Sequence, residues 1–283
     1  MLAHTFGCVR FVYNSALSFS KERYEQGNKT NFNDWNKNLT TLEKEADFSW
    51  LKNISSGPLQ QSFRHLDKVF FKSEFGYPKF KNKRGKQPAC YMANAFKFNA
   101  EIKQITLAKL KNPCKVTLSI PFNSSPSSVY VSKTKTGKDF ISMLVETEIQ
   151  PLPIANKTVG VDVGIKSLAA CSDGAIFNNP KYTKKYEKKL AKAQRKLSKK
   201  AKGSNNFNKQ RIIVAKIHEK IANCRVDFTR KMTTKLINEN QVIYTESLRV
   251  KNMVKNKKLA KEISDANFGE IVRQLEYQAA WYG

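Results

Sequence analysis

Apolar residues recur at helical spacing through the first part of the chain. Positions three or four apart are apolar across residues 6–17, 35–46 and 59–70, with polar residues between them. An α-helix has about 3.6 residues per turn, so this spacing gives each segment one apolar stripe. Gly27 follows the first segment and Pro58 opens the third, which suits a helix end and a helix start. The pattern predicts a helical domain over residues 1–76.

The period changes to two in the middle of the chain. Apolar and polar residues alternate around Phe96, across residues 116–120, and in two runs at 129–131 and 141–145. Alternation is typical of strands with one buried face, and the Gly-containing stretch between the last two runs indicates a hairpin turn. We therefore predict a β-rich domain over residues 77–154.

The last part, residues 155–283, combines both periods. Apolar runs at 159–163, 167–172 and 175–177 predict strands, and a further run predicts a strand at 242–245. Two long apolar seams separated by a Gly-Ser-Asn turn predict an antiparallel helical hairpin over about 182–239. A terminal helix is predicted from Phe268, with Asp265 as its N-cap. The predicted fold class is α/β, with an α+β arrangement over the chain as a whole.

Two of these strands carry a carboxylate. Asp162 lies among apolar residues of the first strand, two positions before Gly164, and Glu246 directly follows the run 242–245. A buried unpaired carboxylate costs several kcal/mol, and a divalent metal ion is one way to neutralise it. The alternative is an Asp that merely ends the strand and caps the turn.

The charge balance predicts a polyanionic partner. Lys and Arg number 51 against 23 Asp and Glu, which gives a net charge of +28. Most of the basic residues are Lys, which suits contacts to phosphates more than reading of base edges. The alternatives are a basic protein of the ribosomal or chromatin type without chemistry and, less well supported, a membrane-surface protein.

Candidate nucleic-acid-binding residues lie in three segments. The third helix carries a basic stripe, a loop after it interleaves aromatic and basic residues, and the hairpin carries many lysines. Aromatic and basic residues together suit base stacking with phosphate contact. The alternatives are solvated faces for the stripe and for the hairpin lysines, and a flexible linker for the loop. The candidates are Arg64, Lys68, Lys72, Tyr77, Lys79, Phe80, Lys81, Lys83, Arg84, Lys188, Lys192, Lys196 and Lys199.

The cysteines and the apolar runs indicate the compartment. The five cysteines are scattered and have no C-x-x-C spacing, so the chain has no zinc ribbon and its cysteines are expected to be reduced thiols. There is no signal peptide and no apolar run near the roughly 20 residues that span a membrane. We expect a cytoplasmic, nucleoid-associated protein.

Two motifs give the chain a family resemblance. Gly160-Val-Asp-Val-Gly164 with Leu168-Ala169 resembles the first RuvC motif, and Thr245-Glu-Ser-Leu248 with Lys251-Asn-Met253 resembles the second. Further stretches in the same order, among them Tyr77-Pro-Lys-Phe-Lys81, extend the likeness over nearly the whole chain. The chain resembles the transposon-encoded TnpB (OrfB-type) proteins, compact relatives of type V CRISPR nucleases.

The resemblance implies a fold, an activity and partners. The fold would be an RNase H-like RuvC domain with a helical-hairpin insertion, preceded by a helical recognition lobe and a small OB-like β-barrel. The activity would be Mg²⁺-dependent, RNA-guided cleavage of DNA, with guide RNA and target DNA as partners and no membrane. Asp162 would bridge two metal ions and Glu246 would bind one of them.

The chain also departs from the family pattern. In the family an initial strand precedes the first helix, and a zinc-binding cysteine cluster and a third catalytic Asp follow the terminal helix. We therefore expect a chain truncated at its C-terminus and at its N-terminus, catalytically incomplete, with Zn²⁺ only in the missing part. The alternative is a non-catalytic RNA- and DNA-binding remnant that acts by occupancy. A DNA-strand transferase is a weaker reading, since no Tyr or Ser nucleophile has a convincing setting.

Overall fold

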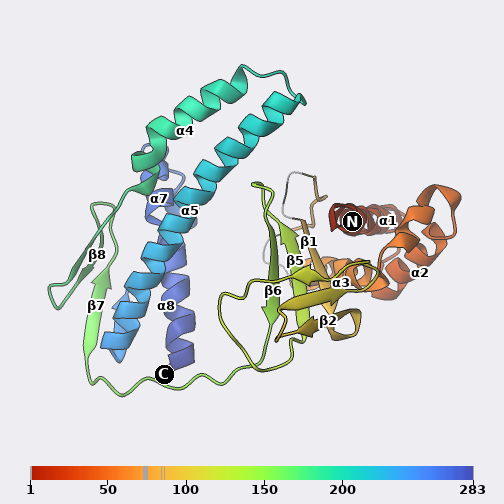
Figure 1. The fold of residues 1–283 in the computed structure, drawn as a ribbon. Coiled ribbons are helices and arrows are strands. Elements are labelled where there is room, and N and C mark those ends of the chain that lie inside the picture. Colours follow the sequence, from red (N-terminus) through yellow and green to blue (C-terminus); the bar gives the residue numbers. More distant parts are fainter. Residues whose placement is uncertain (1, 73–75, 84, 86, 283) are drawn as a thin grey trace. The chain divides into compact units, whose positions relative to one another are not determined.

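The computed structural model describes residues 2–72, 76–83, 85 and 87–282. The chain divides into two compact units, Met1–Thr147 and Glu148–Gly283, and each is described by itself (Figure 1).

Helices form the first part of unit 1. Phe6, Val9, Tyr13 and Leu17 are all buried on the first helix, as their spacing predicts. The helix ends before Gly27, whose positive φ of 79° suits a residue without a side chain. The helices are α1 (Leu2–Glu25), α2 (Phe32–Leu42) and α3 (Ser56–Lys72), with 3-10 helices η1 (Ala46–Asn53) and η2 (Ala93–Ala95).

Two antiparallel sheets follow in the same unit. One has the strand order β1-β5-β6 and the other β2-β3-β4. Ala89, Val129 and Val131 of the first sheet join the core that α1 and α3 also line, so helices and strands of unit 1 share one core. The division of this unit into a helical domain and a β-rich domain stays a prediction. The closure of its strands into a barrel also stays a prediction. The strands are β1 (Gln87–Met92), β2 (Phe96–Asn99), β3 (Gln104–Leu107), β4 (Cys114–Lys115), β5 (Ser128–Lys133) and β6 (Asp139–Leu144).

The prediction of a strand at residues 116–120 is wrong. Strand β4 ends at Lys115, and Ile120 is 74% exposed. Pro113 and Pro121 flank this stretch. A proline removes a ladder donor, and alternating residues without a pairing strand stay irregular.

Unit 2 contains a mixed sheet with the strand order β10-β7-β8-β9. Strands β7 and β10 pair in parallel, whereas β8 is antiparallel to both β7 and β9. Each of the predicted runs forms a strand. The strands are β7 (Thr158–Asp162), β8 (Ser167–Cys171), β9 (Ile176–Asn178) and β10 (Val242–Thr245).

Long helices complete unit 2. Helices α5 and α8 lie side by side next to the sheet (Figure 1) and bury Leu236 and Ile271 in one core with Val159 and Val161 of β7. Helix α4 packs on the first part of α5 through Ala193, Ile217 and Ile221, which confirms the predicted hairpin. The helices are α4 (Tyr182–Ser198), α5 (Asn205–Glu239), α6 (Val250–Met253), α7 (Ala260–Ala266) and α8 (Phe268–Tyr282).

The cysteines are free thiols. Cys8, Cys90 and Cys171 are buried, and burial raises the pKa of the Cys8 thiol to about 11, so this sulfur stays protonated at neutral pH. Within the part of the chain that the structure describes, no helix is both long and apolar enough to cross a membrane.

Candidate nucleic-acid and metal site

The pairing of β7 with β10 brings Asp162 and Glu246 together. In the parallel register Thr245 pairs with Val161, so the next position on each strand is Glu246 and Asp162 respectively. Neighbouring strands lie about 4.8 Å apart, and paired residues of parallel strands point to the same face. The segment between Asp162 and Glu246, which includes β8, β9 and the hairpin, therefore returns the chain to the carboxyl end of β7.

Both carboxylates line one open pocket. The pocket has a volume of about 510 Å³, and Tyr244 contributes to it from the same face of β10. Val159 and Val161 point to the opposite, buried face. This arrangement confirms that the two acids lie at the ends of adjacent strands of one mixed sheet.

The two acids differ from the sequence-based picture in one respect. Asp162 is the last residue of β7 and is exposed, as is Glu246, so the premise that Asp162 is buried in a core strand is wrong. The carboxyl end of the strand faces water because the chain turns there. An added Cβ on Gly164 would lie 3.1 Å from the carbonyl oxygen of Ser167, which explains a glycine in this tight turn.

The carboxylates are free to take a cation. Among the described residues, neither carboxylate has a hydrogen-bond or ion-pair partner, and no third His, Cys, Asp or Glu completes a metal-binding group with them. Mg²⁺ prefers hard oxygen ligands and keeps several waters in proteins, so two carboxylates fit its needs. Two adjacent unpaired negative charges also repel each other, which a cation relieves.

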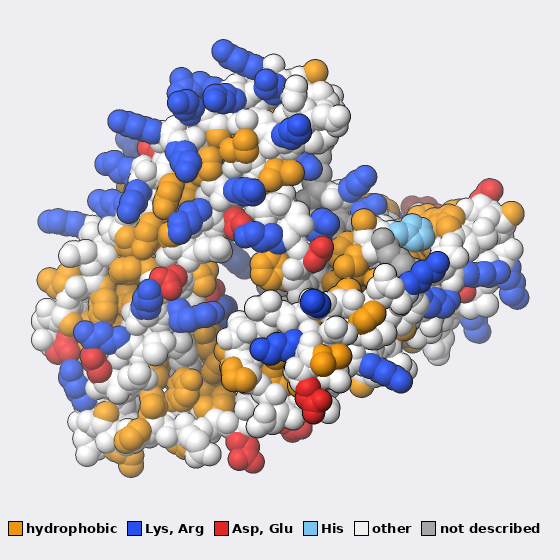
Figure 2. All heavy atoms as spheres, viewed as in Figure 1, with side chains coloured by type: hydrophobic (Ala, Val, Ile, Leu, Met, Phe, Trp, Pro, Cys, Tyr) orange, Lys and Arg blue, Asp and Glu red, His pale blue; other side chains and the backbone are white. Residues whose placement is uncertain are grey.

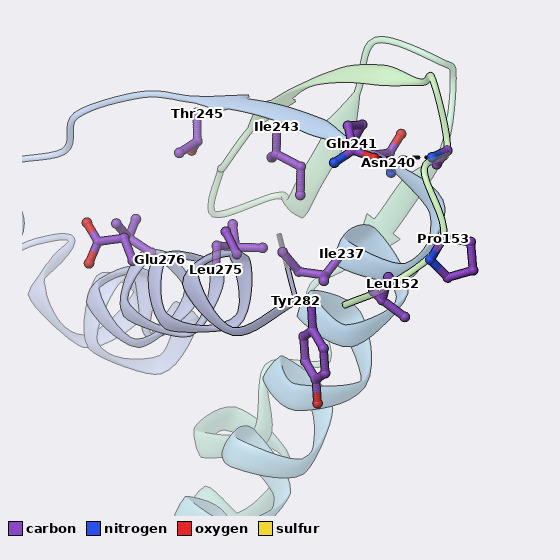
Figure 3. A pocket seen from close by; sticks show the side chains of 13 residues that line it. Leu152, Pro153, Ile237, Asn240, Gln241, Ile243, Thr245, Leu275, Glu276 and Tyr282 are labelled. Atoms are coloured by element: carbon purple, nitrogen blue, oxygen red, sulfur yellow. Dashed lines mark hydrogen bonds between the residues drawn. The ribbon is translucent and has the colours of Figure 1, made fainter. Parts of the chain in front are cut away.

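A separate groove lies on the other face of the same sheet. Figure 3 shows Ile243 and Thr245 pointing from β10 toward Leu275 on α8, with Leu152 and Tyr282 closing one end. The groove has a volume of about 210 Å³ and its lining is mostly apolar. Its chemistry does not suit phosphates, so it is not part of the carboxylate site.

The basic stripe of α3 is solvent-exposed in part. Arg64 and Lys68 are exposed, and the Arg64 guanidinium lies 5.0 Å from the Phe32 ring centroid, a cation–π contact. The Lys72 side chain and the whole of Arg84 lie outside the described residues. The stripe can meet phosphates, although exposure alone is equally typical of a solvated face.

The aromatic and basic loop is held in place. Tyr77, Lys79, Phe80 and Lys83 are exposed. Lys81 instead turns inward, with its Nζ 3.7 Å from the centroid of the Tyr13 ring. Burial lowers the pKa of Lys81 to about 8. The Lys81 side chain therefore attaches the loop to α1 and is not an exposed phosphate ligand.

The hairpin lysines face solvent. Lys188, Lys192 and Lys196 are exposed on α4, and Lys199 is exposed at its C-cap. Figure 2 shows Lys and Arg side chains gathered over the hairpin, with apolar side chains between them. Because Ala193 is buried in the seam toward α5, the basic residues cover the outer faces of α4.

Asp265 has a different role from the one predicted. It lies within α7, not at the start of α8, where Asn267 has a positive φ of 62°. Its carboxylate accepts hydrogen bonds from the backbone N–H of Thr183 (2.9 and 3.1 Å) and from its hydroxyl (2.7 Å). Arg225 lies 3.6 Å away on α5. Asp265 thus caps α4 across 82 residues of chain, which no local pattern can reveal.

The sequence patterns did not identify two residues of the candidate sites. Tyr244 shares the pocket with the acids, and Lys21 lies over the rings of the loop at residues 77–82. Tyr244 stands two residues before Glu246, so alternation placed it on the same face and was a usable signal. Lys21 is one of many lysines and carried no signal of its own.

These features define a class: strongly basic α/β proteins that present an acidic pair at the strand ends of a mixed sheet. Comparison with known proteins narrows it. The OrfB_IS605 family, described as a probable transposase, matches residues 140–257, and its helix-turn-helix domain matches residues 1–29, where the structure has α1.

Two relatives that are similar over all or nearly all of the chain support this family assignment. A Streptomyces pristinaespiralis protein named "Putative RNA-guided DNA endonuclease" is 40% identical, over all of this chain and 71% of its own length. The Escherichia coli protein "Putative RNA-guided DNA endonuclease InsQ" is 34% identical, over 98% of this chain and 73% of its own length. The chain belongs to the OrfB (TnpB) family of transposon-encoded proteins.

A solved structure shares the fold. The Cas12f1 chain of a complex with single guide RNA and target DNA aligns with all of this chain and 71% of its own, with a TM-score of 0.52 and 14% identity. At this identity the likeness concerns the fold.

Proposed function

We propose that this chain is an RNA-guided DNA endonuclease of transposon origin, with guide RNA and target DNA as its partners. The observation that carries the proposal is the pair of unpartnered carboxylates, Asp162 and Glu246, on adjacent parallel strands of one sheet. The names of the relatives and the net charge of +28 support the same conclusion.

We assign the metal site to Asp162 and Glu246. These two carboxylates would hold Mg²⁺, which would supply activation of a water molecule and stabilisation of the leaving oxygen of a phosphodiester. The protein's part is to hold both carboxylates at the end of a paired strand, where their backbones are fixed by the ladder. The RNase H-like character of the sheet belongs to this proposal, as do the helical lobe, the OB-like barrel and the domain bounds near residues 76 and 154.

The exposed basic residues form the second part of the proposal. Lysines on the outer faces of α4 and on α3 would contact phosphates, because an ammonium group acts as a point charge that needs no fixed geometry. Within unit 1, Lys79 and Lys83 add to the basic residues of α3 from the loop that follows it. Each such contact releases a counterion from the nucleic acid, which makes affinity depend on salt.

A non-catalytic protein that binds RNA and DNA and acts by occupancy is the second candidate. One observation favours it: within the described residues the acidic pair has no third ligand. Catalysis needs metal ions placed to a fraction of an ångström, and a misplacement of about 1 Å can cost roughly a hundredfold in rate.

Guided cleavage with carboxylate variants tests the proposal. Asp162→Asn and Glu246→Gln keep the side-chain shape but remove one metal ligand each. We expect each to lower the cleavage rate by about a hundredfold or more, with RNA affinity unchanged. Asp227→Asn is the matched control, because it neutralises an exposed carboxylate on α5 whose partner is Lys231.

The outcomes separate the two candidates. Guided DNA binding without cleavage by the wild type, unaffected by both variants, would favour occupancy. Cleavage that survives both substitutions would contradict the assigned site.

A further inference from the structure

The loop at residues 77–82 is fixed to helix α1 although it has no regular secondary structure. The Asn14 side chain donates to the carbonyl oxygen of Lys81 (2.9 Å) and accepts from its backbone N–H (2.8 Å). The Lys81 ammonium lies on the Tyr13 ring, and Pro78 is buried. Backbone and side-chain contacts together therefore hold the loop in one position.

This fixed loop presents two aromatic rings to solvent. Tyr77 is 56% exposed and Phe80 is 50% exposed. Phe70 packs edge-on against Tyr77, with ring centroids 5.5 Å apart, and supports it from α3. The exposed part of each ring gains no transfer free energy in the free protein, so it is available to a ligand with a flat apolar surface.

A single cation accompanies both rings. The Nζ atom of Lys21 on α1 lies 4.8 Å from the centroid of Phe80 and 5.8 Å from that of Tyr77. Lys21 is exposed, and Lys79 is exposed between the rings along the chain. The site thus combines two flat apolar surfaces with positive charge, whereas Lys81 directs its charge inward.

We propose that Tyr77, Phe80 and Lys21 form a binding site for one unpaired nucleotide, whose base stacks on an exposed ring and whose phosphate meets Lys21. A nucleobase offers the flat π-face and its phosphate the negative charge, which matches the two components of the site. A base inside a duplex is stacked on its neighbours, so the site selects an unpaired one. This inference rests on the proposed function and names a contact that the function needs.

RNA and DNA strands share this chemistry, and the test separates them. The full chain is titrated with short unstructured RNA and DNA oligonucleotides and with matched strands in which abasic sugars replace the nucleotides. With RNA, with DNA or with both, we expect the strand that carries bases to bind roughly 5- to 150-fold more tightly than the abasic strand. This is the range for one base stacked on an aromatic side chain.

Variants locate the preference. Phe80→Leu and Tyr77→Leu keep an apolar side chain but remove the π-face, and each should reduce the preference for bases. Phe140→Leu is the matched control, because Phe140 on β6 is also 50% exposed and belongs to neither the loop nor α1. Thermal unfolding of each variant verifies that the fold is retained.

The readouts separate this inference from the proposed function. If the wild type binds no strand in a salt-dependent way, the proposed function fails. If it binds but shows no preference for bases in either arm, or if Phe80→Leu and Tyr77→Leu keep the full preference, only the stacking site is overturned.

Discussion

Asp162 and Glu246 illustrate at the scale of single residues how a site can oppose stability. Two carboxylates on adjacent strand ends repel each other, and among the described residues no cation neutralises them. Functional sites often lower the stability of the folded protein, and the repulsion is tolerated when the pair binds a ligand. The stability of the chain should therefore respond to divalent metal through these residues.

We predict that Mg²⁺ raises the Tm of the wild type but not that of Asp162→Asn. A ligand that binds only the folded state stabilises it by mass action. In EDTA the same variant should melt about 1–3 °C higher than the wild type, since it removes a like-charge contact. Differential scanning fluorimetry measures both shifts, with Asp227→Asn as control. An equal response of wild type and variant to Mg²⁺ would contradict the site.

Lys81 gives a prediction for pH. Its pKa is about 8 in the folded chain, against about 10.5 for an ordinary Lys, because burial disfavours the charged form. The Tyr13 ring acts in the opposite direction and limits the shift. Between pH 8 and 10.5 the unfolded chain binds more protons, so this residue makes the free energy of unfolding rise with pH in that window.

Competitive acylation followed by mass spectrometry measures this titration. We expect Lys81 to gain nucleophilicity near pH 8. Denaturant unfolding of Lys81→Met should lack the wild type's contribution over the same pH window. A Lys81 that titrates near its ordinary pKa of 10.5 would show that the loop does not bury its ammonium.

At the scale of elements, the contact between Asp265 and Thr183 joins two distant segments of unit 2. Asp265 caps α4 from α7, and Arg225 of α5 lies beside the same carboxylate. Lys261 and Glu187 add an ion pair between α7 and α4. The base of the hairpin is therefore tied to the helix that precedes α8.

Removing this cap should destabilise unit 2. Asp265→Ala loses the hydrogen bonds to Thr183 and leaves Arg225 without its carboxylate, at a cost of about 1–3 kcal/mol. Asp265→Asn keeps part of the cap and should cost less. Urea unfolding measures the difference, and hydrogen exchange should localise it to the first turn of α4. A loss no larger than that of Asp227→Asn would rule out the capping role.

The sequence predicts elements well where pattern and pairing agree. The run at 242–245 forms β10 with these bounds, and the apolar stripe of α1 is buried as predicted. Alternation at 116–120 misleads because a strand also needs a partner, which the local pattern does not contain. The same limit applies to Asp265, whose partner lies 82 residues away.

The candidate site was also predictable from the sequence only in part. Motifs identify Asp162 and Glu246, and the parallel register of β7 and β10 explains why they meet. The inward turn of Lys81 and the position of Lys21 depend on how the loop packs on α1, and residue types do not encode it. Sequence thus gives the acids but not the geometry of the loop.

At the scale of the whole molecule, the net charge of +28 dominates. We predict that affinity for structured RNA falls by orders of magnitude between about 50 and 200 mM salt, because each phosphate contact releases a counterion. Fluorescence anisotropy across a salt series measures the slope. A nearly flat response would remove nucleic acid as the partner.

The hairpin should account for part of that slope. Replacing Lys188, Lys192, Lys196 and Lys199 by Gln removes four exposed charges from α4 and its C-cap without touching its apolar seam. If these lysines meet phosphates, the slope should decrease by up to about four, and sequence preference should not change. An unchanged slope would mark the outer faces of α4 as merely solvated.

The central claim is that Asp162 and Glu246 share a divalent cation, and anomalous diffraction from crystals soaked in Mn²⁺ tests it most directly. Mn²⁺ takes the same oxygen ligands as Mg²⁺ and is visible by its anomalous signal. We expect a peak in contact with both carboxylates, absent in Asp162→Asn. A map in which the two carboxylates point apart, with no peak between them, would contradict it.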